Sequence, residues 1–186
     1  MNTSYIFIVG VSRSGTSLMR HILNEHDQIA ISRENHFLGH LISSEGARQK
    51  FRQFGDLKDD QNVREMVDYI YTKRLAKDSK RGAMSSHWQW LVKRVDRQDF
   101  EDKILESDRS ERAIFASLME LFAEKKGKPI KGEKTPAHVR YVPTLLEWFP
   151  EAKVIHMLRD PRGVYVSELR RRYKVANTTP YKQLKK

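Results

Sequence analysis

The stretch YIFIVGVSRSGTS, residues 5–17, decides the fold of this chain. Its first five residues are apolar at every position, which is typical of a central strand in a parallel sheet that is covered on both faces. Gly10 and Gly15 then bound a short loop with the spacing G-x-x-x-x-G. Apolar residues follow at helical spacing, at Leu18, Met19, Ile22 and Leu23. A strand, a glycine-bounded loop and a helix together predict the opening of an α/β nucleotide-binding unit.

The loop between the two glycines is suited to an anion. Loops of this kind turn successive backbone amides inward and place the anion at the N-terminus of the following helix, where Thr16 and Ser17 add hydroxyl donors. ATP- and GTP-hydrolysing P-loops carry a Lys after the second glycine, but here Thr16 stands at that position. The cation is Arg13, inside the loop. The loop therefore predicts phosphate binding without the residue that nucleotide hydrolysis requires.

A second strand–helix junction lies near the other end of the sequence. Lys153–Leu158 (KVIHML) predicts a strand, and it ends in Arg159. Asp160 as N-cap and Pro161 at the first helical position predict the start of a helix, whose apolar face would contain Val164, Tyr165 and Leu169. The strand lacks the acidic residue that helps P-loop NTPases to hold Mg²⁺. We therefore expect protein cations, and no metal ion, to neutralise the phosphates.

The remaining sequence completes the predicted fold, an α/β P-loop-type parallel sheet flanked by helices, in a single domain over residues 1–186. We expect a strand at Ile29–Ser32, a helix around Phe37–Ile42 and a loop at residues 132–136 (GEKTP). Residues 44–108 are polar and helical in pattern, which predicts a helical insertion.

Two further features of the middle of the chain stand out. The stretch HWQWLV, residues 87–92, is read either as core packing or as an aromatic wall for a substrate. Ser110 is a candidate helix N-cap.

Charge and composition restrict the classes of function. The chain has 35 Lys and Arg against 24 Asp and Glu, a net charge of +11, and residues 153–186 alone hold ten basic and two acidic residues. Such a concentration suits a polyanion or a phosphate-rich small molecule. The absence of Cys excludes disulfides and thiolate chemistry, and the seven His show no metal-ligand spacing. The N-terminal apolar run is too short for a membrane span, so we expect a cytoplasmic protein with no transmembrane segment.

Both junctions resemble those of one enzyme family. VGVSRSGTSLMRHIL resembles the 5′-phosphosulfate loop of sulfotransferases, and VIHMLRDPRGVYVSELRRR resembles their 3′-phosphate motif. The loop, the segment around Glu34 and the KTP sequence are most similar to tyrosylprotein sulfotransferases and their bacterial relatives. The resemblance implies transfer of a sulfuryl group from 3′-phosphoadenosine-5′-phosphosulfate (PAPS) to a hydroxyl or amine, with adenosine-3′,5′-bisphosphate (PAP) as product.

The resemblance also implies roles for individual residues. It assigns the 5′-phosphate and sulfate to the loop, and the 3′-phosphate to Arg159 and Ser167. Glu34 matches the catalytic base, with His36 as the alternative base, and Lys134 matches a Lys that stabilises the transferring group. The loop residues expected to bind PAPS are Ser12, Arg13, Ser14, Gly15, Thr16 and Ser17, and Arg13 is also expected to act in catalysis.

Several alternatives stay open from the sequence alone. A P-loop kinase or another ATP-binding protein is the main rival, and a nucleic-acid-binding module is a second one that rests only on the basic C-terminal segment. Family domains continue beyond the 3′-phosphate helix, so we expect the C-terminal part of the family domain to be absent here. We expect a small-molecule, carbohydrate or peptide acceptor and no nucleic-acid partner, while a homodimer stays open.

Overall fold

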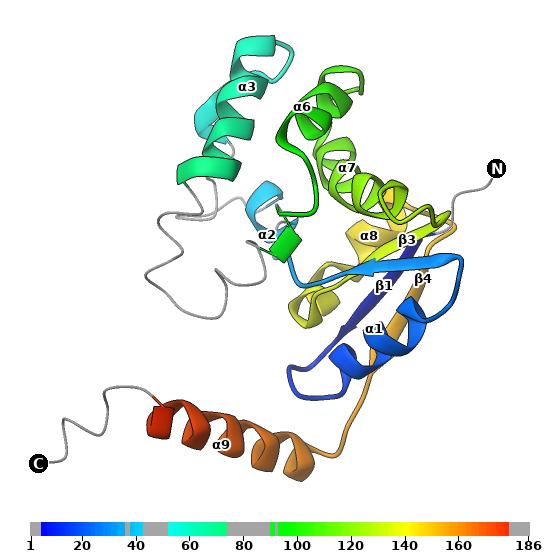
Figure 1. Cartoon of the computed structure of the whole chain (residues 1–186), viewed down its shortest axis with the longest axis vertical. Coiled ribbons are helices and arrows are strands. Elements are labelled where there is room, and N and C mark those ends of the chain that lie inside the picture. The colour runs from blue at the N-terminus through cyan, green and yellow to red at the C-terminus, as the bar shows by residue number, and fades with distance from the viewer. Residues whose placement is uncertain (1–4, 36–37, 43–51, 74–89, 92, 179–186) are drawn as a thin grey trace, which may run out of the picture.

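The computed structural model describes residues 5–35, 38–42, 52–73, 90–91 and 93–178. Its centre is a four-stranded sheet in the order β2-β3-β1-β4, in which every pair is parallel. The strands are β1 (Tyr5–Gly10), β2 (Ile29–Ser32), β3 (Ile130–Lys134) and β4 (Lys153–Met157). The predicted parallel α/β architecture is therefore confirmed (Figure 1).

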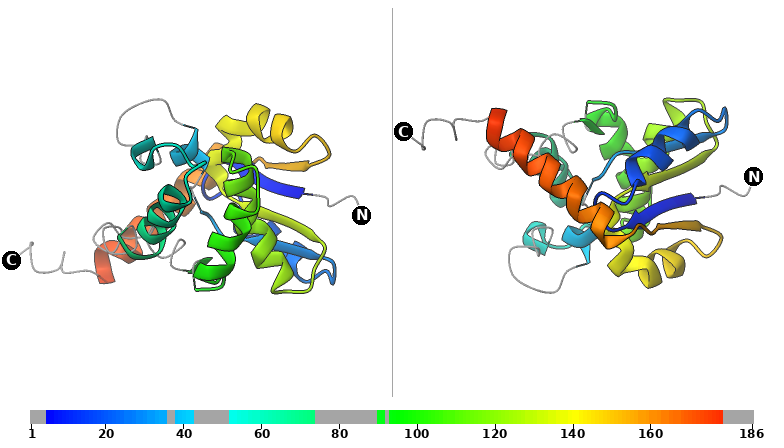
Figure 2. Two further views of the ribbon diagram at one scale, coloured as in Figure 1. Left: turned by 90° about the horizontal axis from the view of Figure 1, so that it is seen from above. Right: turned by 90° about the horizontal axis from the view of Figure 1, so that it is seen from below.

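Alternate residues of β1 supply the two faces of the sheet. Phe7 and Val9 belong to the larger core, which contains α7 (Glu111–Glu124), and Ile8 belongs to a smaller core under α1 (Thr16–Asn24). Side chains alternate between the two faces along a strand, and helices cover both faces. Residues on either face of β1 therefore pack against a core, which explains why the run is apolar throughout. Figure 2 shows helices on both sides of the sheet.

The helical part of the chain between β2 and β3 fills the larger core. Ser110 caps α7 as predicted, because its hydroxyl accepts a hydrogen bond from the Ala113 amide at 3.1 Å. The described elements between β2 and α7 are α2 (Leu38–Leu41), the 3₁₀ turn Arg52–Phe54, α3 (Asp60–Asp68), the π-helical turn Tyr69–Lys73 and α6 (Arg97–Leu105). After β3 follow the 3₁₀ segment Pro136–Tyr141 and α8 (Val142–Trp148).

The expected loop at residues 132–136 is wrong in its first half. Gly132, Glu133 and Lys134 belong to β3, which lies between β1 and β2. The side chains of Glu133 and Lys134 are buried at the end of the strand, where other polar groups pair with them. Gly132 is needed because a Cβ there would overlap the carbonyl oxygen of Ile6 on β1.

The apolar residues of the last helix are more exposed than expected. Asp160 accepts a hydrogen bond from the Arg162 amide at 2.8 Å, so α9 (Pro161–Thr178) begins as predicted. However, Tyr165 is 64% exposed and Leu169 is 45% exposed. Figures 1 and 2 show the cause, since α9 runs away from the sheet and leaves this face uncovered by the described part of the chain.

Only part of the apolar face predicted for helix α1 is buried. Met19 and Leu23 pack on the sheet, whereas Leu18 and Ile22 point away from it and are exposed.

We predict that Gly132→Ala lowers stability severely, by about 3 kcal/mol, because the added methyl group meets backbone that cannot move without breaking the sheet. Gly127→Ala is the matched control. Gly127 has a φ of +64°, and a Cβ there meets no described atom within 4 Å, so only backbone strain of about 1 kcal/mol is expected. Urea unfolding followed by circular dichroism measures both values, and equal losses would contradict the assigned clash.

Candidate active site

The loop between β1 and α1 has the backbone conformation of an anion-binding turn. Gly10, Arg13 and Gly15 all have positive φ values, of 141°, 73° and 104°. A Cβ on Gly10 would lie 2.5 Å from the carbonyl oxygen of Met157, so only glycine allows the close approach of β4. Gly15 is the N-cap of α1 and brings no side chain, so the first amides of the helix stay available to an anion.

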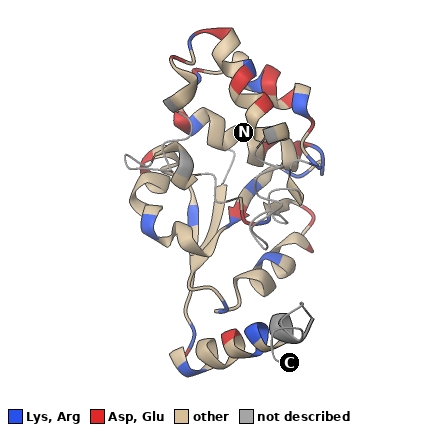
Figure 3. Ribbon diagram, turned by 90° about the vertical axis from the view of Figure 1, so that its left-hand side faces the viewer, with Lys and Arg blue, Asp and Glu red and all other residues tan. Residues whose placement is uncertain are grey.

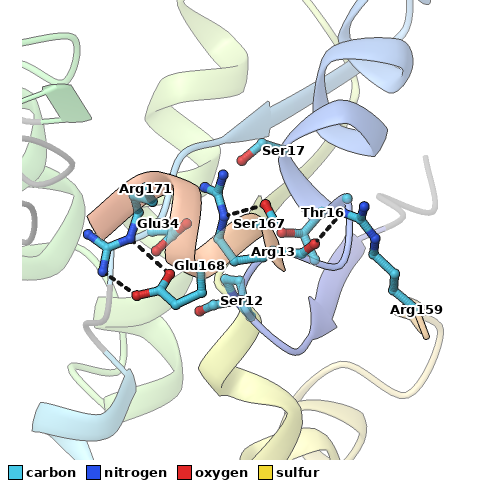
Figure 4. A pocket seen from close by; sticks show the side chains of 11 residues that line it. Ser12, Arg13, Thr16, Ser17, Glu34, Arg159, Ser167, Glu168 and Arg171 are labelled. Carbon is cyan, nitrogen blue, oxygen red and sulfur yellow. Dashed lines mark hydrogen bonds and ion pairs between the residues drawn. The ribbon is translucent and has the colours of Figure 1, made fainter. Parts of the chain in front are cut away.

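The two strand–helix junctions meet at one edge of the sheet. Arg159, which follows β4, donates a hydrogen bond to the carbonyl oxygen of Arg13 at 3.0 Å. The Arg13 Nε in turn donates to the hydroxyl of Ser167 on α9 at 3.1 Å. Figure 4 shows these side chains converging from the two junctions. Residues about 150 positions apart in the sequence are thereby held together.

A cleft of about 550 Å³ opens between the junctions, within the size range of small-molecule sites. Of the ten residues predicted for the site, eight line this cleft: Ser12, Arg13, Gly15, Thr16, Ser17, Glu34, Arg159 and Ser167. Ser14 does not line the cleft, because its side chain is buried. The Ser14 hydroxyl makes no hydrogen bond with the described residues. Lys134 does not line the cleft either, but it contacts a residue that does.

Glu34, which lines the cleft, forms an ion pair with Lys134. Glu34 follows the end of β2 and Lys134 ends β3, and these neighbouring parallel strands bring both residues to the same edge. Only 2% of the Lys134 side chain is exposed, so Lys134 is not the loop residue that the sequence suggested. The pair places a carboxylate and an ammonium group side by side, one able to accept a proton and the other able to stabilise negative charge.

A second buried network supports the strand that carries Lys134. The carboxylate of Glu133 accepts hydrogen bonds from the Thr135 hydroxyl and from Nδ1 of His138, both at 2.5 Å, and all three side chains are buried. The Thr135 oxygen accepts a further bond from the amide of Asn35, the residue after Glu34. The network thus joins the segments that carry Glu34 and Lys134 and restricts their separation.

Three lining residues were missed by the sequence analysis, namely Pro136, Glu168 and Arg171. The Glu168 carboxylate accepts hydrogen bonds from Arg171 at 2.5 Å and from Arg172 at 3.1 Å. These bonds from two guanidinium groups lower the pKa of Glu168 to about 2. The missed signal is helical spacing, because Arg171 lies one turn after Ser167 on α9.

The charges around the cleft are mostly positive. Figure 3 shows basic residues along the loop before α9 and along α9 itself, while acidic residues gather on α3 and α6. His36, the alternative base, lies outside the described residues. Among the residues that the structure describes, no group of three His, Asp or Glu side chains is placed to hold a metal ion. No described helix is both long enough and apolar enough to cross a bilayer.

We predict that Glu133→Gln destabilises the protein by about 3 kcal/mol. The carboxylate accepts one hydrogen bond on each oxygen, from Thr135 and from His138, whereas an amide has one oxygen and an NH₂ group that would be buried without an acceptor. Glu168→Gln is the control, since that carboxylate is partly exposed at the cleft and its partners are exposed arginines, and it should leave the melting temperature nearly unchanged. Differential scanning calorimetry of both variants is the measurement. A melting temperature of Glu133→Gln equal to that of the wild type would show that the network does not restrain the strand.

The chain is similar to known sulfotransferases. A solved sulfotransferase, STF9 from Mycobacterium avium, is 14% identical to the chain, with a TM-score of 0.37, and the alignment covers 87% of this chain and 44% of that one. The chain therefore spans less than half the length of that protein. No curated protein sequence matches it significantly. The model of the sulfotransferase family matches residues 5–185, which is nearly the whole sequence. The chain belongs to the sulfotransferase family.

Proposed function

We propose that the cleft binds PAPS and that the chain transfers its sulfuryl group to a hydroxyl or amine acceptor, which leaves PAP. The observation that carries this proposal is the meeting of the two junctions at one cleft, through the bond from Arg159 to the Arg13 carbonyl. PAPS has anionic groups at both ends of its ribose, and each junction offers donors for one of them. The family match supports the same reaction class.

The β1–α1 loop suits the 5′-phosphosulfate end. The free amides at the start of α1 and the hydroxyls of Thr16 and Ser17 would donate to the phosphate and sulfate oxygens. Arg13 adds a full positive charge in the same loop. Ser12 and Gly15 would contribute backbone amides. The Ser14 amide donates to the carbonyl oxygen of Val11 at 3.1 Å, so it would have to exchange that bond to contact the nucleotide.

The β4–α9 junction suits the 3′-phosphate. Arg159 and Ser167 both line the cleft, and a guanidinium group beside a hydroxyl matches a phosphate with several acceptor oxygens. In this proposal the bond from Arg13 to Ser167 exchanges for bonds to the nucleotide. With cations and amides at both ends, we predict that binding requires no metal ion.

The chemical step would be an in-line displacement at sulfur. The acceptor oxygen or nitrogen forms a bond to sulfur, the bond from sulfur to the 5′-phosphate oxygen breaks, and its electron pair stays on PAP. Glu34 takes the acceptor proton, while Arg13 and Lys134 stabilise the charge on the sulfuryl and bridging oxygens. The ion pair between Glu34 and Lys134 supports these roles, because it holds base and cation within one contact of each other.

The acceptor in this proposal is a small molecule, a carbohydrate or a peptide. The likeness of the loop, the Glu34 segment and the KTP sequence to tyrosylprotein sulfotransferases favours a peptide, and this subtype stays a prediction. The cytoplasmic location of the protein stays a prediction as well.

We predict that Arg159→Ala weakens PAP binding about 10- to 100-fold, the effect of removing one or two charge-assisted hydrogen bonds. Isothermal titration calorimetry with and without EDTA measures this affinity, and EDTA should have no effect. Arg162→Ala, in the first turn of α9, is the matched control and should bind PAP normally, because within the described part of the chain Arg162 pairs with Asp160. Tighter binding of ATP with Mg²⁺ than of PAP would instead favour a kinase.

We predict that Glu34→Gln lowers the rate of sulfate transfer about 10²- to 10⁴-fold, because the amide cannot accept the acceptor proton. PAP affinity should stay within about twofold, since the carboxylate is not assigned to the nucleotide. Transfer of ³⁵S from labelled PAPS to a panel of phenols, sugars and peptides measures the rate. An unchanged rate with Glu34→Gln would remove Glu34 from the mechanism.

A further inference from the structure

Three arginine side chains converge on the ring of Trp90. The guanidinium carbons of Arg94, Arg33 and Arg20 lie 4.3, 5.1 and 6.0 Å from the ring centre. They come from separate parts of the chain, since Arg20 is on α1, Arg33 follows β2 and Arg94 follows the segment that contains Trp90. We call these four residues the arginine cluster.

The cations of the arginine cluster have no acidic partner among the described residues. Arg20 is only 8% exposed, yet its guanidinium group donates no hydrogen bond to any residue that the structure describes. Arg94 donates to the carbonyl oxygen of Trp90 at 2.9 Å and to no other residue that the structure describes. By contrast, Arg109 is paired with Asp60 at 2.6 Å, and Arg171 is paired with Glu168 at 2.5 Å. The Arg20 nitrogen atoms are not among the fully buried polar atoms without a partner, so an anion from solvent can reach donors that have no acceptor among the described residues.

Electrostatics point the same way. Burial lowers the pKa of Arg20, and the nearby charge of Arg33 lowers it further. The π-face of Trp90 offsets part of this unfavourable energy, but a cation–π contact is worth only about 0.5–2 kcal/mol. An anion between the guanidinium groups would remove the repulsion and supply the missing hydrogen-bond acceptors.

The arginine cluster has a fixed place relative to the base. Asn24, on the same helix as Arg20, exchanges two hydrogen bonds with the backbone of Ile31 on β2, at 2.9 and 3.0 Å. Helix α1 is therefore tied to the strand that leads into Arg33 and Glu34. Arg33 directly precedes Glu34, so the arginine cluster includes the residue next to the predicted base, although none of its members is among the residues that line the cleft.

We propose that the arginine cluster binds an anionic group of the acceptor (a carboxylate, sulfate or phosphate ester) and orients its hydroxyl or amine toward Glu34. The assignment of this anion to an acceptor rests on the proposed sulfuryl transfer, whereas anion binding by the arginine cluster does not. The aromatic ring and the planar guanidinium groups also select for a ligand whose anionic group is next to a flat or apolar part.

The first test measures anion binding with inorganic sulfate as the probe. To silence the nucleotide cleft, the background carries Arg13→Ala and Arg159→Ala, and sodium sulfate is compared with sodium chloride at equal ionic strength. We expect sulfate to raise the melting temperature in this background and to lose most of that effect when Arg20→Met is added. In chloride alone, Arg20→Met should raise the melting temperature, because it removes an unpaired buried charge.

Arg33→Met, at a less buried position, is the second variant if Arg20→Met does not fold. Arg97→Met, an arginine that pairs with Glu101, is the control and should keep the full effect of sulfate. A sulfate effect that is equal with and without Arg20→Met or Arg33→Met would overturn the proposal. So would a fall in the melting temperature of Arg20→Met in chloride, since that result assigns Arg20 to packing.

The second test separates this inference from the proposed function. With wild-type cleft residues, Arg20→Met should raise the KM of an anionic acceptor at least tenfold. The kcat, the PAP affinity and the KM of an uncharged analogue should stay within about twofold. Failure of PAP to bind would refute the proposed function and leave the sulfate result standing. Equal KM increases for charged and uncharged acceptors would refute the inference and leave PAP binding standing.

Discussion

Parallel pairing is the constraint on which the site depends. Strands β1, β2, β3 and β4 all run in one direction, so their carboxyl ends, and the residues that follow them, emerge at one edge. The anion loop follows β1, Glu34 follows β2, Lys134 ends β3 and Arg159 follows β4. Four short segments with no sequence proximity thus form one cleft without any long loop to position them. The register of β1 with β4, which sets Gly10 against Met157, brings two of these segments into contact.

The sequence predicted the parts of this arrangement whose signal is local. The all-apolar run of β1, the caps at Ser110 and Asp160, and the two glycines of the loop each act through neighbours within a few positions. The GEK stretch could not be placed in the same way. Its charged side chains are satisfied by Glu34, Thr135 and His138, and nothing in the local pattern of residues 132–134 reveals those partners.

The same distinction applies to the candidate site. Arg13, Arg159 and Ser167 were found because their junctions resemble a known pair, whereas Glu168 and Arg171 are seen only once α9 is placed over the cleft. The apolar face of α9 was predicted from the helical spacing of its apolar residues. That spacing identifies which residues share a face, but it does not reveal whether another part of the protein covers that face. Trp90 shows a third limit of prediction from the sequence. Its aromatic character was noted, but two of the three cations around it, Arg33 and Arg20, lie 57 and 70 positions earlier in the sequence, and only Arg94 lies close to it, four positions later.

The contact between Glu34 and Lys134 has a consequence for the order of events in the proposed reaction. While the carboxylate is ionised, the ammonium group is neutralised by its neighbour and attracts other anions weakly. Once Glu34 has accepted a proton, that neutralisation ends, and the full charge of Lys134 becomes available at the moment when negative charge moves onto the departing oxygen. Deprotonation of the nucleophile and electrostatic assistance to the leaving group would then be a single concerted event that needs no separate movement of the backbone.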